Sequence, residues 1–156
     1  MAQANPIDYF AIRNTIATYC IALDTKDFQL LRHVFVEDVD AVYPFWQIKG
    51  VQNVADAIQK RLSPTTTQHA LTTQIIEIAE DGNDAQVTTY FTGTHFGQGR
   101  WKGQQVTAWG RYLDTLVLTD DKDCLPGASG KWLISKRVVE FMSRLGEEGV
   151  MNGEDG

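Results

Sequence analysis

The spacing of apolar residues changes at Pro64, and this change limits the folds that the chain can adopt. Before Pro64 apolar residues recur every three or four positions, as they do on one face of a helix. After Pro64 they alternate with polar residues, as they do along a strand. Helices therefore come first and a series of strands follows. This order predicts an α+β fold in which helices cover one face of a curved antiparallel or mixed sheet.

Three helices are expected before Pro64: residues 8–23, residues 28–35 after a possible N-cap at Asp27, and a third that begins after Gly50. A brief strand is expected at residues 39–43, between the second and third helices. The apolar faces comprise Ile12, Ile16, Cys20 and Leu23 in the first helix, Leu30, Leu31 and Val34 in the second, and Val51, Val54, Ala55 and Ile58 in the third.

Four long strands are expected after Pro64, at residues 67–79, 84–97, 103–119 and 131–143. The sequence DGND at 81–84 is typical of a hairpin turn, so consecutive strands should pair antiparallel. With 156 residues and no evident linker, the chain predicts one domain over residues 1–145. Residues 146–156 are rich in glycine and acidic side chains, which predicts a disordered tail.

Composition argues against several classes of partner. The net charge is −6, and lysines and arginines do not cluster, so neither nucleic acid nor an anionic membrane surface is expected to bind. No apolar stretch reaches the roughly 20 residues of a membrane span, and the N-terminus does not resemble a signal peptide. A cytoplasmic protein is expected. Cys20 and Cys124 have no metal-binding spacing, and no glycine-rich phosphate loop precedes a helix, so no cofactor is predicted.

Two histidines on the predicted strands are candidates for a functional site. By alternation, His69 and His95 each point to the same face as apolar neighbours, and Asp24 ends the first helix near that face. An acid and two imidazoles could therefore meet in an apolar pocket. Each also has a structural interpretation: a buried histidine can bind a backbone carbonyl, and Asp24 can cap a helix. The apolar neighbours are Leu71 and Ile75 for His69, and Val87 and Phe91 for His95.

Five short segments resemble the cone-shaped nuclear-transport-factor-2-like (NTF2-like) fold. They are LDTKDFQLLRHVF at 23–35, VYPF at 42–45, TQHAL at 67–71, TGTHF at 92–96 and GKWLI at 130–134. Within this fold they are most similar to the SnoaL-like branch that contains scytalone dehydratase, over residues 8–141. The resemblance implies a conical pocket between helices and sheet. It does not imply one substrate, because the fold hosts isomerases, cyclases, epoxide hydrolases and non-catalytic binders.

The resemblance also implies roles for individual residues. Asp24, Tyr43, His69 and His95 match the dehydratase's catalytic positions, at which the aspartate holds one histidine, the other histidine acts as acid or base, and tyrosine polarises the substrate carbonyl. We expect Asp24 to fix the tautomer of His95. The substrate-binding positions carried over are Leu23, where the family has a second tyrosine, Thr107 in place of a serine, Trp109 in place of an amide, and the pocket aromatic Phe91.

Three functional hypotheses follow. The first is a cofactor-independent dehydratase, isomerase or cyclase that uses His69 and His95 as acid/base groups on an oxygenated polyketide-like or terpenoid-like molecule. The second is a metal enzyme with a site formed by His69, His95 and Asp24. The third is a non-catalytic binding or dimerisation module. The exposed face of the sheet leads us to expect a homodimer or another homo-oligomer.

Overall fold

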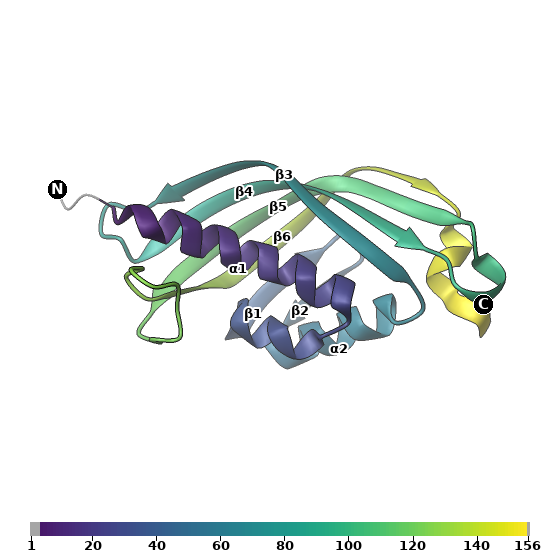
Figure 1. The fold of residues 1–156 in the computed structure, drawn as a ribbon, viewed down its shortest axis with the longest axis horizontal. Helices are drawn as coiled ribbons and strands as arrows, with labels where there is room; N and C mark the ends of the chain where they lie inside the picture. The colour runs from purple at the N-terminus through teal and green to yellow at the C-terminus, as the bar shows by residue number, and fades with distance from the viewer. Residues whose placement is uncertain (1–3, 156) are drawn as a thin grey trace.

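A single curved sheet of six strands forms the frame of the computed structural model, which describes residues 4–155 (Figure 1). The strand order is β2-β1-β6-β5-β4-β3. The β1–β6 pair is parallel and the other pairs are antiparallel, so the sheet is mixed. In chain order the elements are α1 (Pro6–Thr25), the 3-10 helix η1 (Phe28–His33), β1 (Phe35–Tyr43), β2 (Trp46–Lys49), α2 (Val51–Leu62), β3 (Thr66–Ile78), β4 (Asp84–Phe96), the 3-10 helix η2 (Gly99–Trp101), β5 (Gln105–Thr119), β6 (Lys131–Gly146) and the 3-10 helix η3 (Glu148–Asp155).

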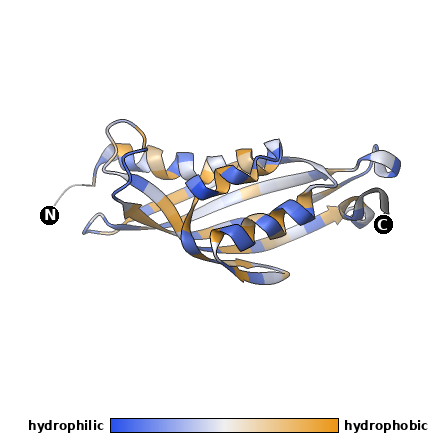
Figure 2. Ribbon diagram, turned by 90° about the horizontal axis from the view of Figure 1, so that it is seen from below, coloured by the Kyte–Doolittle hydropathy of each residue, from blue (hydrophilic) through white to orange (hydrophobic). Residues whose placement is uncertain are grey.

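The helices α1 and α2 lie on the same face of this sheet (Figures 1 and 2). Asn5 caps α1 by accepting a hydrogen bond from the Ile7 amide, and Pro6 occupies its first turn, where the missing N–H costs nothing. The apolar faces expected for α1 and α2 are both buried. The α+β prediction is therefore confirmed, with the core between the two helices and the concave face of the sheet.

The second predicted helix differs from expectation. It is a 3-10 helix that ends at His33, and the strand β1 already begins at Phe35. Asp27 stands at the N-cap position, but its side chain makes no capping hydrogen bond. Leu31 is fully buried and Leu30 is only partly buried, because a tight turn of three residues cannot place both side chains against the core.

Strand β3 contains an irregularity that changes which side chains face the core. Its pairing with β4 shifts between Leu71 and Gln74. An extra residue in one strand reverses the facing of all later side chains, so the expectation that Ile75 shares the face of His69 was wrong. Ile75 is 62% exposed, and Ile76 packs against the core instead.

The C-terminal segment also departs from the sequence prediction. Strand β6 extends to Gly146, and η3 follows where a disordered tail was expected. Val150 is completely buried, and the Trp101 indole N–H donates a 2.8 Å hydrogen bond to the carbonyl of Gly153. Composition alone did not reveal that Val150 and Trp101 would have packing partners. No helix in the described part of the chain is long and apolar enough to cross a membrane.

Candidate active site

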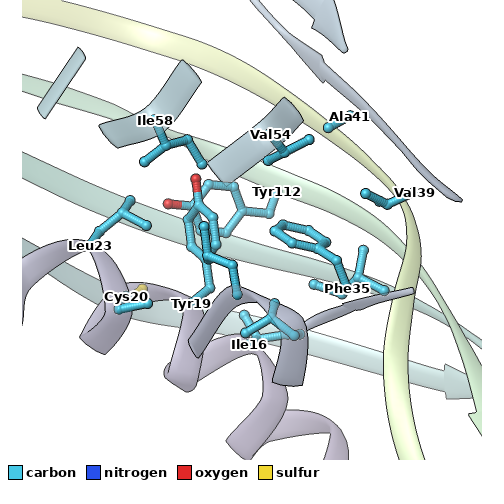
Figure 3. Close-up of a cluster of buried hydrophobic side chains, with 14 of the residues drawn as sticks. Ile16, Tyr19, Cys20, Leu23, Phe35, Val39, Ala41, Val54, Ile58 and Tyr112 are labelled. Carbon is cyan, nitrogen blue, oxygen red and sulfur yellow. The ribbon is translucent and has the colours of Figure 1, made fainter. Parts of the chain in front are cut away.

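An apolar cavity lies between α1, α2 and the concave face of the sheet. The cavity volume is about 60 Å³, which is room for a few water molecules. Figure 3 shows Leu23 and Tyr19 extending from α1 toward Ile58 on α2 and Tyr112 on β5. The lining comprises Tyr19, Leu23, Tyr43, Phe45, Trp46, Ile58, Arg61, Leu62, His69, Phe91, Gly93, His95, Ala108, Tyr112, Val139, Phe141 and Arg144.

Asp24 and His69 form a hydrogen-bonded pair at the wall of this cavity. The Asp24 Oδ1 atom lies 2.7 Å from Nδ1 of His69, and its Oδ2 atom accepts a 2.8 Å hydrogen bond from the His69 backbone N–H. The Thr67 hydroxyl donates a third bond, of 2.9 Å, to Oδ1. Because an ionised carboxylate can only accept, Nδ1 of His69 carries a proton, and the lone pair of the neutral ring is on Nε2. This is the arrangement of an oriented general base.

The end of α1 places Asp24 for this contact. A carboxylate in the last turn of a helix opposes the helix dipole, so its hydrogen bonds must offset that cost. Burial raises the pKa of Asp24, but the bonds and charge of His69 and the bond from Thr67 outweigh burial and hold the pKa below its usual value. Lys26 ends the helix in the left-handed conformation, with φ 61°, and its Nζ donates to the carbonyl of Leu23. Such a conformation is unfavourable for lysine and fixes the chain just after Asp24.

His95 lies beside His69 but makes no contact with Asp24. The centroids of the two rings are 5.9 Å apart and the rings are nearly perpendicular. The expectation that Asp24 fixes the tautomer of His95 was therefore wrong, because β3 and not β4 passes the end of α1. His95 is 6% exposed, and its Nδ1 is buried without a hydrogen-bond partner in the described structure. Burial lowers the pKa of His95 to about 3, together with the imidazole of His69 and the charges of Arg144 and Arg61. His95 is thus a neutral polar group at neutral pH.

Gly93 is a site residue that the sequence analysis missed. It pairs with His69 across β3 and β4, and a Cβ atom there would lie 3.0 Å from Cδ2 and 3.2 Å from Nε2 of His69. The absence of a side chain therefore lets the imidazole lie across β4. The signal was the glycine in TGTHF, since glycine inside a strand often marks a close approach.

Two phenols occupy the cavity wall opposite the strands that carry the histidines. The hydroxyls of Tyr43 and Tyr19 are 2.9 Å apart, and both side chains are buried. Burial raises the pKa of each phenol above its ordinary value, so both remain protonated donors. Leu23 occupies the family's second tyrosine position and lines the cavity, but Tyr19, one turn earlier on the same face of α1, supplies a second phenol. Their four-residue spacing could have revealed this.

A buried ion pair between Arg137 and Asp114 packs next to the phenol of Tyr19. Arg137 on β6 and Asp114 on β5 are joined by two hydrogen bonds of 2.7 Å, and both side chains are fully buried. The Arg137 guanidinium lies 4.2 Å from the ring centroid of Tyr19 and 4.0 Å from that of Tyr112. Arg137 thus packs against two aromatic residues that line the cavity, and it was not recognised from the sequence.

Two predicted substrate-binding residues lie outside the cavity. In the β4–β5 pairing, His95 lies opposite Val106 and Gly93 lies opposite Ala108, so Val106 and Ala108 share the cavity side of the sheet. Because side chains alternate along a strand, Thr107 and Trp109 point to the other side of the sheet. The Thr107 hydroxyl is bonded there to another threonine, and Trp109 is 37% exposed. Their assignment by resemblance was wrong by one residue, because Ala108 lines the cavity. Leu23 and Phe91 do line the cavity, and their role in binding a substrate stays a prediction.

The described residues contain no group of three or more His, Cys, Asp and Glu side chains arranged to hold a metal ion. Both carboxylate oxygens of Asp24 are already bonded to His69, one to the backbone N–H and one to Nδ1, and neither is bonded to His95. The donor set therefore does not fit the two-histidine, one-carboxylate site of the second hypothesis.

The fold and this pocket define an NTF2-like protein with an Asp–His pair. The family called SnoaL-like domain matches residues 7–138, and the chain belongs to this family. No curated protein sequence matches the chain significantly.

Solved structures with the same fold confirm the architecture. The Kfla4162 protein from Kribbella flavida is 16% identical, with 89% of this chain and 93% of that chain covered and a TM-score of 0.77. A putative scytalone dehydratase from Novosphingobium aromaticivorans is 20% identical, with coverage of 92% and 90% and a TM-score of 0.76. The hexachlorocyclohexane dehydrochlorinase LinA-type3 from Novosphingobium barchaimii is 14% identical, with 92% of each chain covered and a TM-score of 0.74. At these identities the likeness shows the fold alone.

Proposed function

We propose that this protein is a cofactor-independent lyase that removes a proton next to a carbonyl group and expels a leaving group from the adjacent carbon. The observation that carries the proposal is the Asp24–His69 pair, in which three hydrogen bonds hold a carboxylate behind an imidazole that lines an apolar cavity. Two of the similar structures have names that denote eliminations, of water and of hydrogen chloride. Isomerisation or cyclisation would begin with the same proton transfer.

The base is Nε2 of His69. It accepts the α-proton, and the electron pair of the broken C–H bond passes into an enolate. Asp24 stabilises the resulting imidazolium through the Nδ1–H bond. The enolate then collapses to a carbon–carbon double bond as the leaving group departs, and a departing hydroxide takes the proton back from Nε2 as water. The balance is loss of one water from a β-hydroxy ketone.

The phenols and His95 would hold the substrate oxygen. Because Tyr19 and Tyr43 share one hydrogen bond, one of their two hydroxyl protons remains available to donate to the developing enolate oxygen. His95 is neutral at neutral pH, so it acts as a hydrogen-bonding group and not as the acid/base group of the first hypothesis. In a cavity that admits only a few waters, such bonds are stronger than in solvent.

The experiment uses two ketone probes. Exchange of the α-protons of α-tetralone in D2O, followed by NMR, reports proton removal alone, and the absorbance of benzalacetone formed from the benzaldehyde–acetone aldol adduct reports elimination. We expect His69→Asn to lower both rates by about 10²- to 10⁴-fold, with a smaller loss for His95→Asn. A folded His69→Asn variant with undiminished rates would refute the mechanism. Binding of the ketones without exchange in the wild type would favour the non-catalytic binder.

A further inference from the structure

Two arginines line the same cavity as the histidines. Arg61 comes from α2 and Arg144 from β6, and the rest of the lining is apolar or aromatic except for the two imidazoles and the tyrosine hydroxyls. The whole chain has a net charge of −6, so this positive region contrasts with the rest of the protein. Both arginines are partly exposed, whereas His95 is buried, so they stand nearer the entrance.

Aromatic side chains hold Arg61 in place. Its guanidinium carbon lies 4.0 Å from the ring centroid of Phe45 and 6.0 Å from that of Trp46. No salt bridge of Arg61 occurs within the described residues. Stacking on an aromatic face leaves the N–H donors at the edge of the guanidinium available. Burial and the nearby charge of Arg144 lower the pKa of Arg61, and the charge of Glu148 offsets only part of this lowering.

Arg144 has a counter-ion that is open to solvent. Its Nε and Nη2 atoms bond to Glu148 at 2.7 and 3.1 Å, which leaves its Nη1 donors uncommitted in this pair. The Arg144 side chain is 17% exposed and that of Glu148 is 63% exposed. Glu148 therefore compensates Arg144 from the outer side, and the cavity side of the guanidinium can still attract an anion.

We infer that the substrate carries a carboxylate that binds between Arg61 and Arg144, while its carbonyl and reacting carbon lie deeper, at the phenols and His69. This inference rests on the proposed function and narrows its substrate class. A planar carboxylate fits guanidinium donors in pairs. The chain has no glycine-rich phosphate loop, and the two guanidiniums are the only permanently charged groups among the described residues of the lining, which favours a single carboxylate over a phosphate ester.

The test compares cinnamate with cinnamamide, which have the same carbon skeleton and differ in charge. Calorimetric titration of the wild type is expected to show at least about tenfold tighter binding of cinnamate. Arg61→Gln should lower cinnamate affinity by about tenfold or more and leave cinnamamide affinity nearly unchanged. Glu148→Gln should strengthen cinnamate binding, because it removes the anion that competes for Arg144. Lys60→Gln is the matched control, since Lys60 is an exposed residue next to Arg61 and does not line the cavity.

Equal affinities for cinnamate and cinnamamide in the wild type, or equal losses of cinnamate affinity in Arg61→Gln and Lys60→Gln, would overturn the inference. The same titrations in a His69→Asn background separate this question from catalysis. Retained cinnamate preference in that variant supports the anion site even where ketone turnover is lost. Loss of the preference in the wild type rejects the anion site even where turnover remains.

Discussion

Replacing Gly93 by alanine tests whether the position of the His69 ring matters. The new methyl carbon would lie 3.0 Å from Cδ2 and 3.2 Å from Nε2, whereas ordinary contacts begin at 3.4 Å. The ring must therefore retreat by about 0.4 Å, the difference between 3.4 and 3.0 Å, against the hydrogen bonds that tie it to Asp24. A misplacement of about 1 Å costs roughly 10²-fold in rate, so about 0.4 Å corresponds to a five- to tenfold loss.

The assay is the rate of α-proton exchange and of aldol-adduct dehydration in Gly93→Ala, alongside its free energy of unfolding in denaturant. Alanine in a strand gains about 0.5–1 kcal/mol over glycine, which offsets part of the steric cost, so stability should stay within about 1 kcal/mol of the wild type. The control is Gly93→Ala combined with His69→Asn. Since the methyl acts through the ring, it should add no further loss there. Full activity of Gly93→Ala would refute the reasoning, as would an equal loss in the absence of His69.

Three other perturbations have defined outcomes. The pKa of His95 is about 3 in the folded state and 6.5 in the unfolded state, so the unfolded state binds more protons between these pH values. The free energy of unfolding should therefore fall as the pH drops from 6.5 toward 3. Denaturant titrations across this range should show a shallower fall for His95→Gln than for the wild type. Asp114→Asn leaves the Arg137 charge buried without its partner, and chemical unfolding should show a loss of about 3–5 kcal/mol; a loss below 1 kcal/mol would mean that water reaches the guanidinium. Tyr19→Phe removes the hydrogen-bond partner of Tyr43, so it should lower the free energy of unfolding by about 1 kcal/mol and also lower the dehydration rate. An unchanged dehydration rate would exclude the phenol pair from binding the substrate oxygen.

The fold was largely predictable because the apolar period changes once, at Pro64, and the four long strands after it lie close to the predicted ranges. The errors have local causes. The four-residue strand β2 is too short to show an alternating pattern, and the register shift after Leu71 reversed the facing of Ile75 in a way that no sequence period records. The ordering of η3 depends on Trp101, which is remote in sequence.

The candidate site was predictable as a set of residues but not as a set of contacts. Alternation along the strands and the family resemblance together selected Asp24, Tyr43, His69 and His95. The partner of Asp24 depends on which strand passes the end of α1, and that is a property of tertiary packing. Thr107 was misplaced for a similar reason, since a carry-over by resemblance does not show which β5 residues pair with the cavity-facing residues of β4.

Two further site features escaped because they are defined by what surrounds them. Gly93 matters through the ring that lies over it, and Arg61 matters through Phe45, which orients it toward the cavity. Gly93 stands in TGTHF, but nothing in the sequence indicates which ring lies over it, and Arg61 belongs to none of the quoted segments. Both become visible only when β3, β4 and α2 are assembled.

The base His69 belongs to β3, which is an edge strand of the sheet. An edge strand bonds to one neighbour only, so fraying of β3 breaks a single ladder and leaves the other five strands paired. Asp24 therefore does more than orient an imidazole. Its hydrogen bond from the His69 backbone N–H also ties the edge strand β3 to α1. Amide hydrogen exchange should then speed up along residues 66–71 when Asp24 is replaced, while the amides of β5, at the interior of the sheet, keep their protection.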